Sequence, residues 1–139
     1  MNPLYLYALE QLSAAVSGMA TNPGPIQFRL AVAWGSRLIR LRPDDLPPEL
    51  REEFETLGKL VSWRPAAPGD GTILATCERM DDDLAEDLAR RTCALHGSVD
   101  AARRELDDRE IWSQALRAAQ AQAARPDDER QAASGAPTA

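Results

Sequence analysis

The sequence is poor in the residue types that most often carry chemistry. Its 139 residues include one histidine, one lysine and two cysteines, and aromatic residues make up 5% of the chain. With a single histidine, general acid–base catalysis has to use His96 or a carboxylate. The two cysteines, Cys77 and Cys93, do not make a disulfide framework and are typical of a protein from a reducing compartment.

Long apolar runs are also missing. No run approaches the ~20 apolar residues that a helix needs to span a bilayer. The N-terminal segment lacks the basic start and the apolar stretch of a signal peptide. From these two absences we expect a cytoplasmic protein that does not interact with a membrane.

The charge balance is acidic, with a net charge of −6 from 22 acidic and 16 basic residues. Such a chain is repelled by nucleic-acid phosphates, which argues against general nucleic-acid binding. Hydrophobic residues make up 44% of the chain, and leucine and alanine are abundant among them. This composition favours packed helices over a sheet, because strands prefer β-branched and aromatic residues.

Apolar residues recur at helical spacing along most of the chain. The pattern and the capping residues predict helices over residues 3–20, 25–42, 46–61, 72–80 and 81–124. In the first of these, Asn2 is the expected cap and Pro3 the first helical residue. The sequence therefore predicts an all-α fold, a compact four- to five-helix bundle with a long C-terminal helix. We expect a helical domain at 1–124 and a disordered tail, rich in Pro, Gly, Ser and charge, at 125–139.

Two points of this organisation stay open from the sequence. Residues 72–76 also fit a short strand, although a lone strand has no partner to pair with. Gly97 can divide the last helix, and the apolar stripe changes register after Asp107 and Asp108. The expected core residues are Leu9, Leu12, Val16, Leu30, Trp34, Leu38, Leu50, Phe54, Leu57, Leu84, Leu88 and Leu95.

Trp112 lies where the last apolar stripe loses its register. A large aromatic residue on a weakly amphipathic helix is typical of an anchor for a partner, although it can also fold back onto the bundle. The predicted partner-binding residues are Ile111, Trp112, Leu116, Arg103, Arg104 and Arg109. The leading functional hypothesis is a non-enzymatic interaction or regulatory subunit of a bacterial complex. Its partner is another protein or a second copy of this chain.

A basic stripe supplies a second hypothesis. Arg29, Arg37 and Arg40 fall within roughly a quarter turn of one another if residues 25–42 form one helix. This surface predicts a nucleic-acid-associated regulator. The segment before it contains two prolines and fits a helix-turn-helix poorly, and the 22 acidic residues offer these arginines partners within the chain.

Cys93, His96 and Asp100 share one helical face and supply a third hypothesis, a small metal or thiol enzyme. Cys77 would be a fourth zinc ligand. However, the chain has no closely spaced cysteine pair of the kind that structural zinc sites use. No third group at recognisable spacing would orient a Cys93–His96 pair for nucleophilic catalysis. We therefore assign no catalytic residue, no metal ligand and no cofactor.

Several phrases between residues 5 and 96 resemble a recurring pattern in small bacterial proteins of unknown function. They are Leu9-x-x-Leu12-Ser13-x-Ala15-Val16, Ile26-Gln27-x-Arg29-Leu30-x-x-Ala33, Asp45-Leu46-Pro47-x-Glu49-Leu50-Arg51, Gly71-x-Ile73-x-Ala75-Thr76 and Leu84-Ala85-x-x-Leu88-Ala89. The resemblance implies a compact helical domain. It implies no activity, ligand or catalytic residue, and the extension after residue 97 lies outside the pattern.

Overall fold

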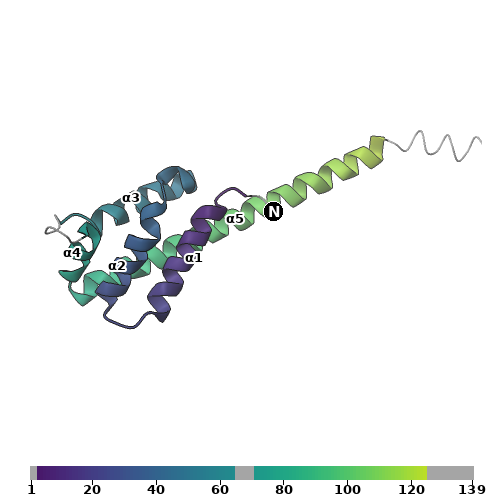
Figure 1. Cartoon of the computed structure of the whole chain (residues 1–139). Coiled ribbons are helices and arrows are strands. Elements are labelled where there is room, and N and C mark those ends of the chain that lie inside the picture. Colours follow the sequence, from purple (N-terminus) through teal and green to yellow (C-terminus); the bar gives the residue numbers. More distant parts are fainter. Residues whose placement is uncertain (1–2, 65–70, 125–139) are drawn as a thin grey trace, which may run out of the picture. The chain divides into compact units, whose positions relative to one another are not determined.

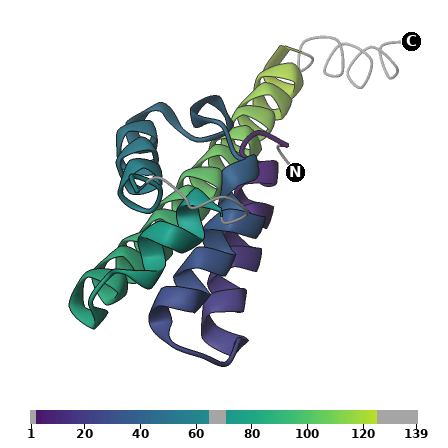
Figure 2. The same ribbon diagram turned by 60° about the vertical axis from the view of Figure 1, so that its left-hand side comes forward.

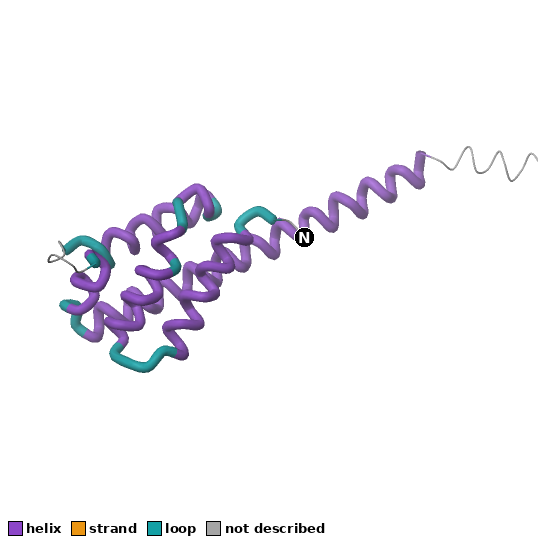
Figure 3. The backbone as a smooth tube through the Cα atoms, in the orientation of Figure 1, coloured by secondary structure: helices purple, strands orange, loops and turns teal. Residues whose placement is uncertain are grey.

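Helices make up most of the part of the chain that the structure describes. The structure, a computed structural model, describes residues 3–64 and 71–124. Figure 3 shows helices and connecting loops, and no strand, in these two ranges. The expected all-α class with a long C-terminal helix is therefore confirmed. The expected tail at 125–139 and the expected cap Asn2 lie outside the described residues.

The chain divides into two compact units, Met1–Arg104 and Glu105–Ala139. The first contains α1 (Leu6–Thr21), α2 (Ile26–Ser36), α3 (Arg51–Leu60) and α4 (Thr72–Glu78). The last helix, α5 (Asp82–Ala124), begins in the first unit and ends in the second (Figure 1). That the helical domain covers residues 1–124 stays a prediction. Within the described ranges, no helix has the length and apolar character that crossing a bilayer requires.

Helices α1 and α2 form an antiparallel pair (Figure 2). The expectation that Pro3 is the first helical residue is wrong. Its carbonyl accepts a hydrogen bond from the Leu6 N–H at 3.1 Å, and Tyr5 has a φ of 66°, so the helix follows a tight turn. Arg29 on α2 donates hydrogen bonds to the carbonyls of Met19 and Gly24, at 2.8 and 3.1 Å. These bonds fasten the end of α1 and the connecting loop to α2.

The expected helix over 25–42 is shorter in the structure. Helix α2 ends at Ser36, and residues Leu38–Arg40 form a 3₁₀ turn, η1. Gly35 and Ser36 are weak helix formers, and the Ser36 hydroxyl donates to the Val32 carbonyl one turn back. Leu38, in this turn, still lies in the core and is 1% exposed.

The expected helix over 46–61 is also shorter, because prolines interrupt its beginning. Two 3₁₀ turns, η2 (Pro43–Asp45) and η3 (Pro48–Leu50), precede α3. A residue before proline avoids the α-helical region, which disfavours helix at Leu46 and Pro47. Arg51 connects these turns, because its Nε donates to the carbonyls of Pro43 and Leu46 at 3.0 and 3.1 Å.

Residues 72–78 form a helix and not a strand, as the pairing argument had indicated. In the loop before this helix, residues 65–70 lie outside the described ranges. The backbone N–H of Arg64 donates to the Thr76 hydroxyl at 3.0 Å, and that hydroxyl donates to the Thr72 carbonyl at 2.8 Å. Thr76 therefore connects α4 to the chain that follows α3.

Helix α5 is continuous through Gly97 and through Asp107, which settles the question left open by the sequence. Asp81 caps it, because its Oδ1 accepts the Leu84 N–H at 2.7 Å. Leu84 itself, an expected core residue, is 42% exposed, so that expectation is wrong. The buried stripe of α5 consists of Ala85, Leu88, Thr92, Leu95, Val99 and Arg103. Ala85, the residue after Leu84 in the first turn, is fully buried.

The core of the first unit gathers around Trp34 on α2. Its ring lies 5.7 Å from the Phe54 ring on α3, and its Nε1 donates to Thr92 Oγ1 on α5 at 3.2 Å. The other expected core residues that are buried are Leu12, Leu30, Leu38, Leu57, Leu88 and Leu95. Leu9, Val16 and Leu50 pack against this core while partly buried.

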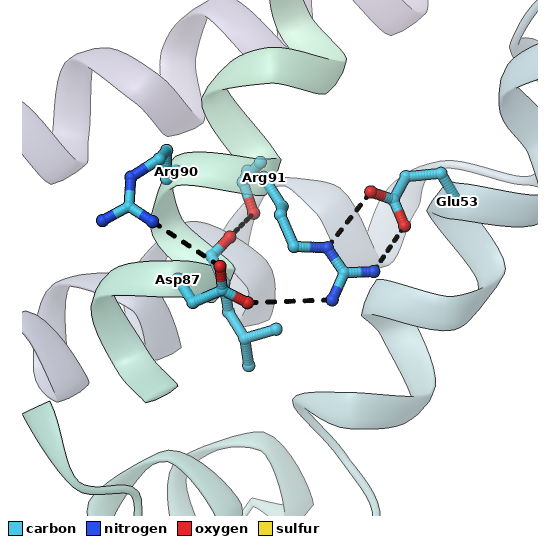
Figure 4. Close-up of polar contacts among 6 residues, drawn as sticks. Glu53, Asp87, Arg90 and Arg91 are labelled. Atoms are coloured by element: carbon cyan, nitrogen blue, oxygen red, sulfur yellow. Dashed lines mark hydrogen bonds and ion pairs between the residues drawn. The ribbon is translucent and has the colours of Figure 1, made fainter. Parts of the chain in front are cut away.

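A charged cluster joins α3 to α5 on the surface of the first unit. Figure 4 shows the Arg91 guanidinium between Glu53 and Asp87, with Arg90 on the other side of Asp87. Arg91 donates to both Glu53 carboxylate oxygens, at 2.6 and 3.2 Å. Hydrogen bonding to Glu53 raises the pKa of Arg91, and the charge of Asp87 raises it further. The cluster has the geometry of a structural ion pair, and it links two helices that are distant in the sequence.

Candidate functional site

The second unit exposes a large apolar face. Ile111, Trp112 and Leu116 are 63%, 76% and 58% exposed, and every described residue from Asp108 to Ala124 is exposed. At roughly 100° per residue these three side chains fall within an arc of roughly 140°. Ala115 and Ala119 lie inside the same arc. We call Ile111, Trp112, Ala115, Leu116 and Ala119 the α5 apolar face.

Charged groups surround this face unevenly. Between Glu105 and Ala124 the acidic residues all precede Ile111, and only Arg117 follows Trp112 among the charged residues. Arg109, one of the predicted partner-binding residues, pairs with Glu105 at 2.6 Å, and both side chains are mostly exposed. An exposed pair of this kind contributes only about 0.3–0.5 kcal/mol.

Two of the predicted partner-binding arginines belong to the first unit. Arg103 was expected on an exposed surface, and the structure corrects this, because the residue is 7% exposed and continues the buried stripe of α5. Arg104 is exposed and pairs with Asp100 at 2.9 Å. The candidate surface in the second unit is therefore limited to Arg109 and the α5 apolar face.

The predicted basic stripe does not form on one helix. Arg29 lies on α2, Arg37 follows its end, and Arg40 belongs to η1, because α2 ends at Ser36. The guanidinium of Arg29 is used in two bonds to backbone carbonyls. Arg37 and Arg40 are exposed. The expectation of a single helical stripe is thus wrong, and a nucleic-acid role for these residues stays a prediction.

The partner that the structure shows for His96 is Ser13 on α1, a residue outside the predicted Cys93, His96 and Asp100 set. His96 Nε2 lies 3.0 Å from Ser13 Oγ on α1, and Cys93 is exposed. Cys77 is buried on α4, where burial raises the pKa of its thiol to about 11. In residues 3–64 and 71–124, no three His, Cys, Asp or Glu side chains converge in a way that could hold a metal ion.

The first unit contains a pocket that sequence reasoning missed. It has a volume of about 710 Å³ and lies between α2, η1, α3 and the start of α4. Its inner surface includes the buried rings of Trp34 and Phe54, and its outer part includes Phe28 and Ile39, which are 47% and 63% exposed. No ionisable side chain is among the described residues that line it.

Two glycines give the pocket part of its space. Gly35 follows Trp34 on α2, and Gly58 lies one turn after Phe54 on α3. A Cβ added at Gly35 would meet nothing within 4 Å, and one at Gly58 would meet the Trp34 ring at 3.7 Å. The sequence offers one signal for this pocket. Each of two expected helices contains a glycine close to a large aromatic residue. The sequence does not show that the two helices face each other.

Comparison with known proteins adds no relative. No family model matches the chain, and no curated protein or solved structure is significantly similar to it. The resemblance to small bacterial proteins therefore stays a prediction, and function has to be argued from the chain's own surfaces.

Proposed function

We propose that this chain is a non-enzymatic interaction or regulatory subunit that binds another polypeptide along the α5 apolar face. In this proposal the chain acts in the cytoplasm, as part of a bacterial complex. The observation that carries the proposal is the exposure of Trp112, 76%, with Ile111 and Leu116 beside it. Tryptophan is enriched among the residues that dominate binding energy at protein interfaces.

Burial of this face would supply a useful binding energy. Full burial of a leucine or isoleucine side chain contributes about 1.5–3 kcal/mol, and a tryptophan buries still more area. The α5 apolar face thus offers several kcal/mol, which binding must set against lost translational and side-chain freedom. This is the pattern of an amphipathic helix that lies in a groove of its partner.

The charges indicate what the partner surface looks like. Asp108 lies within the arc of the α5 apolar face, one turn before Trp112, and Asp107 and Glu110 are close to it in sequence. A fitting partner has an apolar groove with a basic residue at the end that receives Asp108. A partner lined with carboxylates would be repelled at that end.

The test is affinity capture of the tagged full-length chain from cells that express it naturally, followed by quantitative mass spectrometry. We expect a reproducible partner at fixed stoichiometry, and we expect Trp112→Ala combined with Leu116→Ala to reduce its recovery at least tenfold. Leu84→Ala is the matched control, because Leu84 is an exposed leucine on the same helix in the first unit. Equal recovery with the double variant would contradict the proposal.

Sedimentation of the purified chain completes this test. If the partner is a second copy of this chain, the measured mass of the native protein rises with its concentration, and the double variant sediments as a monomer. If the partner is another protein, the mass is that of one chain and the captured partner restores the complex. Circular dichroism has to show equal helix content for all variants. A protein that neither self-associates nor captures a partner would remove the interaction role.

A further inference from the structure

We infer that the pocket between α2, η1, α3 and α4 binds a neutral, mainly apolar small molecule. This inference does not depend on the proposed partner at the α5 apolar face, because the pocket lies wholly in the first unit. It rests on the size of the pocket, on the chemistry of its lining and on the glycines that open it.

The size of the pocket fits a small molecule. Pockets that bind small ligands usually measure about 300–1,000 Å³, and they are concave and mainly apolar. The volume here is about 710 Å³, which lies in the middle of that range. Residues of four elements, α2, η1, α3 and α4, line it.

The lining selects a neutral ligand. A charged ligand loses its hydration on entering such a site and finds no counter-ion among the described residues that line it, which is costly. Trp34 offers only its ring, because its indole N–H is already donated to Thr92. The Ser36 and Ser62 hydroxyls donate to the carbonyls of their own helical turns. They therefore present acceptor lone pairs, which suit a ligand carrying one N–H or O–H donor.

Exposed apolar residues mark the entrance of the pocket. Phe28 and Ile39 line it while 47% and 63% of their surfaces face solvent. An apolar ligand would cover part of this surface, and burial of apolar area is the favourable term for such a ligand. Peptides and nucleotides fit less well, because both carry charged or strongly polar groups that this lining cannot satisfy.

The test uses two fluorescent probes with the same ring system, N-phenyl-1-naphthylamine, which is neutral, and 8-anilinonaphthalene-1-sulfonate, which is anionic. We expect the full-length chain to bind the neutral probe saturably at one site, and to bind the anionic probe at least tenfold more weakly at high salt. High salt screens the general repulsion of an anion by a chain with a net charge of −6. Absence of saturable binding of the neutral probe would overturn the inference.

The variant Gly35→Leu tests whether the neutral probe binds in this pocket. Gly35 lines the pocket, and a Cβ there meets nothing within 4 Å, so a leucine can occupy pocket volume without a clash at its root. We expect it to weaken binding of the neutral probe at least tenfold. Gly97→Leu is the control, because Gly97 is a helical glycine with the same open space outside the pocket. Equal binding by Gly35→Leu and the native chain would place the probe elsewhere and overturn the inference.

A second variant tests the same pocket in case Gly35→Leu does not fold. Ile39→Asp places a carboxylate at the entrance on a residue that is 63% exposed, so the core is left intact. We expect weaker binding of the neutral probe, with Leu84→Asp as the control for an added surface charge. If both pocket variants fold and bind normally, the pocket is not the site. Loss of partner capture by Trp112→Ala, tested separately, has no bearing on this result.

Discussion

Trp34 and Thr92 share a buried hydrogen bond that joins α2 to α5. The indole Nε1 donates to Thr92 Oγ1 at 3.2 Å, and the two residues are 3% and 0% exposed. Thr92 in turn donates to the Leu88 carbonyl at 2.7 Å, so the Thr92 hydroxyl both accepts and donates a hydrogen bond. The polar atom of the largest core residue is thereby satisfied inside an otherwise apolar core.

Thr92→Val is predicted to lower the free energy of unfolding by about 1–3 kcal/mol. Valine keeps the shape of the side chain, but it leaves the Trp34 N–H buried without an acceptor. Urea denaturation followed by circular dichroism measures the change. Trp34→Phe in the Thr92→Val background removes the orphaned donor, so the two losses should be less than additive. Strictly additive losses would show that the hydrogen bond contributes little.

Stability is predicted to fall between pH 9 and about 11 because of Cys77. Burial raises the pKa of this thiol from 9.0 to about 11, so the folded chain holds the proton more tightly than the unfolded chain. A pKa that is raised on folding adds stability below pH 9, and that stability is lost as pH rises through the folded value. The loss is on the order of 2–3 kcal/mol.

The difference between the native chain and Cys77→Val isolates this effect, because other groups that titrate in the same range are common to both. Denaturation midpoints at several pH values between 8 and 11 measure it. Thiol labelling of the folded chain at pH 8 should modify exposed Cys93 and spare Cys77. Parallel pH profiles of the two proteins would contradict the assignment.

Arg29→Met is predicted to cost about 1–2 kcal/mol of stability, whereas Arg37→Met and Arg40→Met should change it by less than about 0.5 kcal/mol. Arg29 satisfies two carbonyls at the end of α1 and in the following loop, while the other two arginines are exposed. Thermal denaturation of the three variants compares them directly. Equal effects at the three positions would indicate that Arg29 acts only as a surface charge.

Gly97→Ala is predicted to stabilise the chain by about 0.4–1 kcal/mol, and Gly24→Ala to destabilise it. Gly97 lies inside α5 with open space for a Cβ, so alanine reduces the freedom of the unfolded chain at no steric cost. Gly24 has a φ of 113°, a conformation that L residues rarely adopt. Chemical denaturation checks both signs, and a loss of stability in Gly97→Ala would show a hidden contact there.

The helical class of the fold could be predicted because the apolar spacing repeats over long segments. The ends of the helices were harder to predict. Helix α2 ends at Ser36, although Leu38 and Leu41 continue the apolar pattern beyond it. Those two residues reach the core through a 3₁₀ turn, and a periodic pattern alone does not distinguish this geometry from a continuing helix.

The candidate sites were predictable in different degrees. Ile111, Trp112 and Leu116 stand out along the chain, because a local change of register marks them. The burial of Arg103 was not predictable, since the long aliphatic part of arginine can occupy a buried stripe position. The pocket depends on Gly35 and Gly58, which lie on different helices, so its detection needs the tertiary arrangement.

The unbroken backbone of α5 has a consequence for how the second unit becomes ordered. A free helix has to form a costly first turn before it gains from propagation, and isolated helices shorter than about 12–15 residues are marginal in water. Here Val99 and its neighbours already hold α5 helical in the core of the first unit, and no proline interrupts it before Ala124. Residues 105–124 therefore extend an existing helix. Amide hydrogen exchange should accelerate gradually from Val99 toward Ala124, as expected of an end that frays one turn at a time.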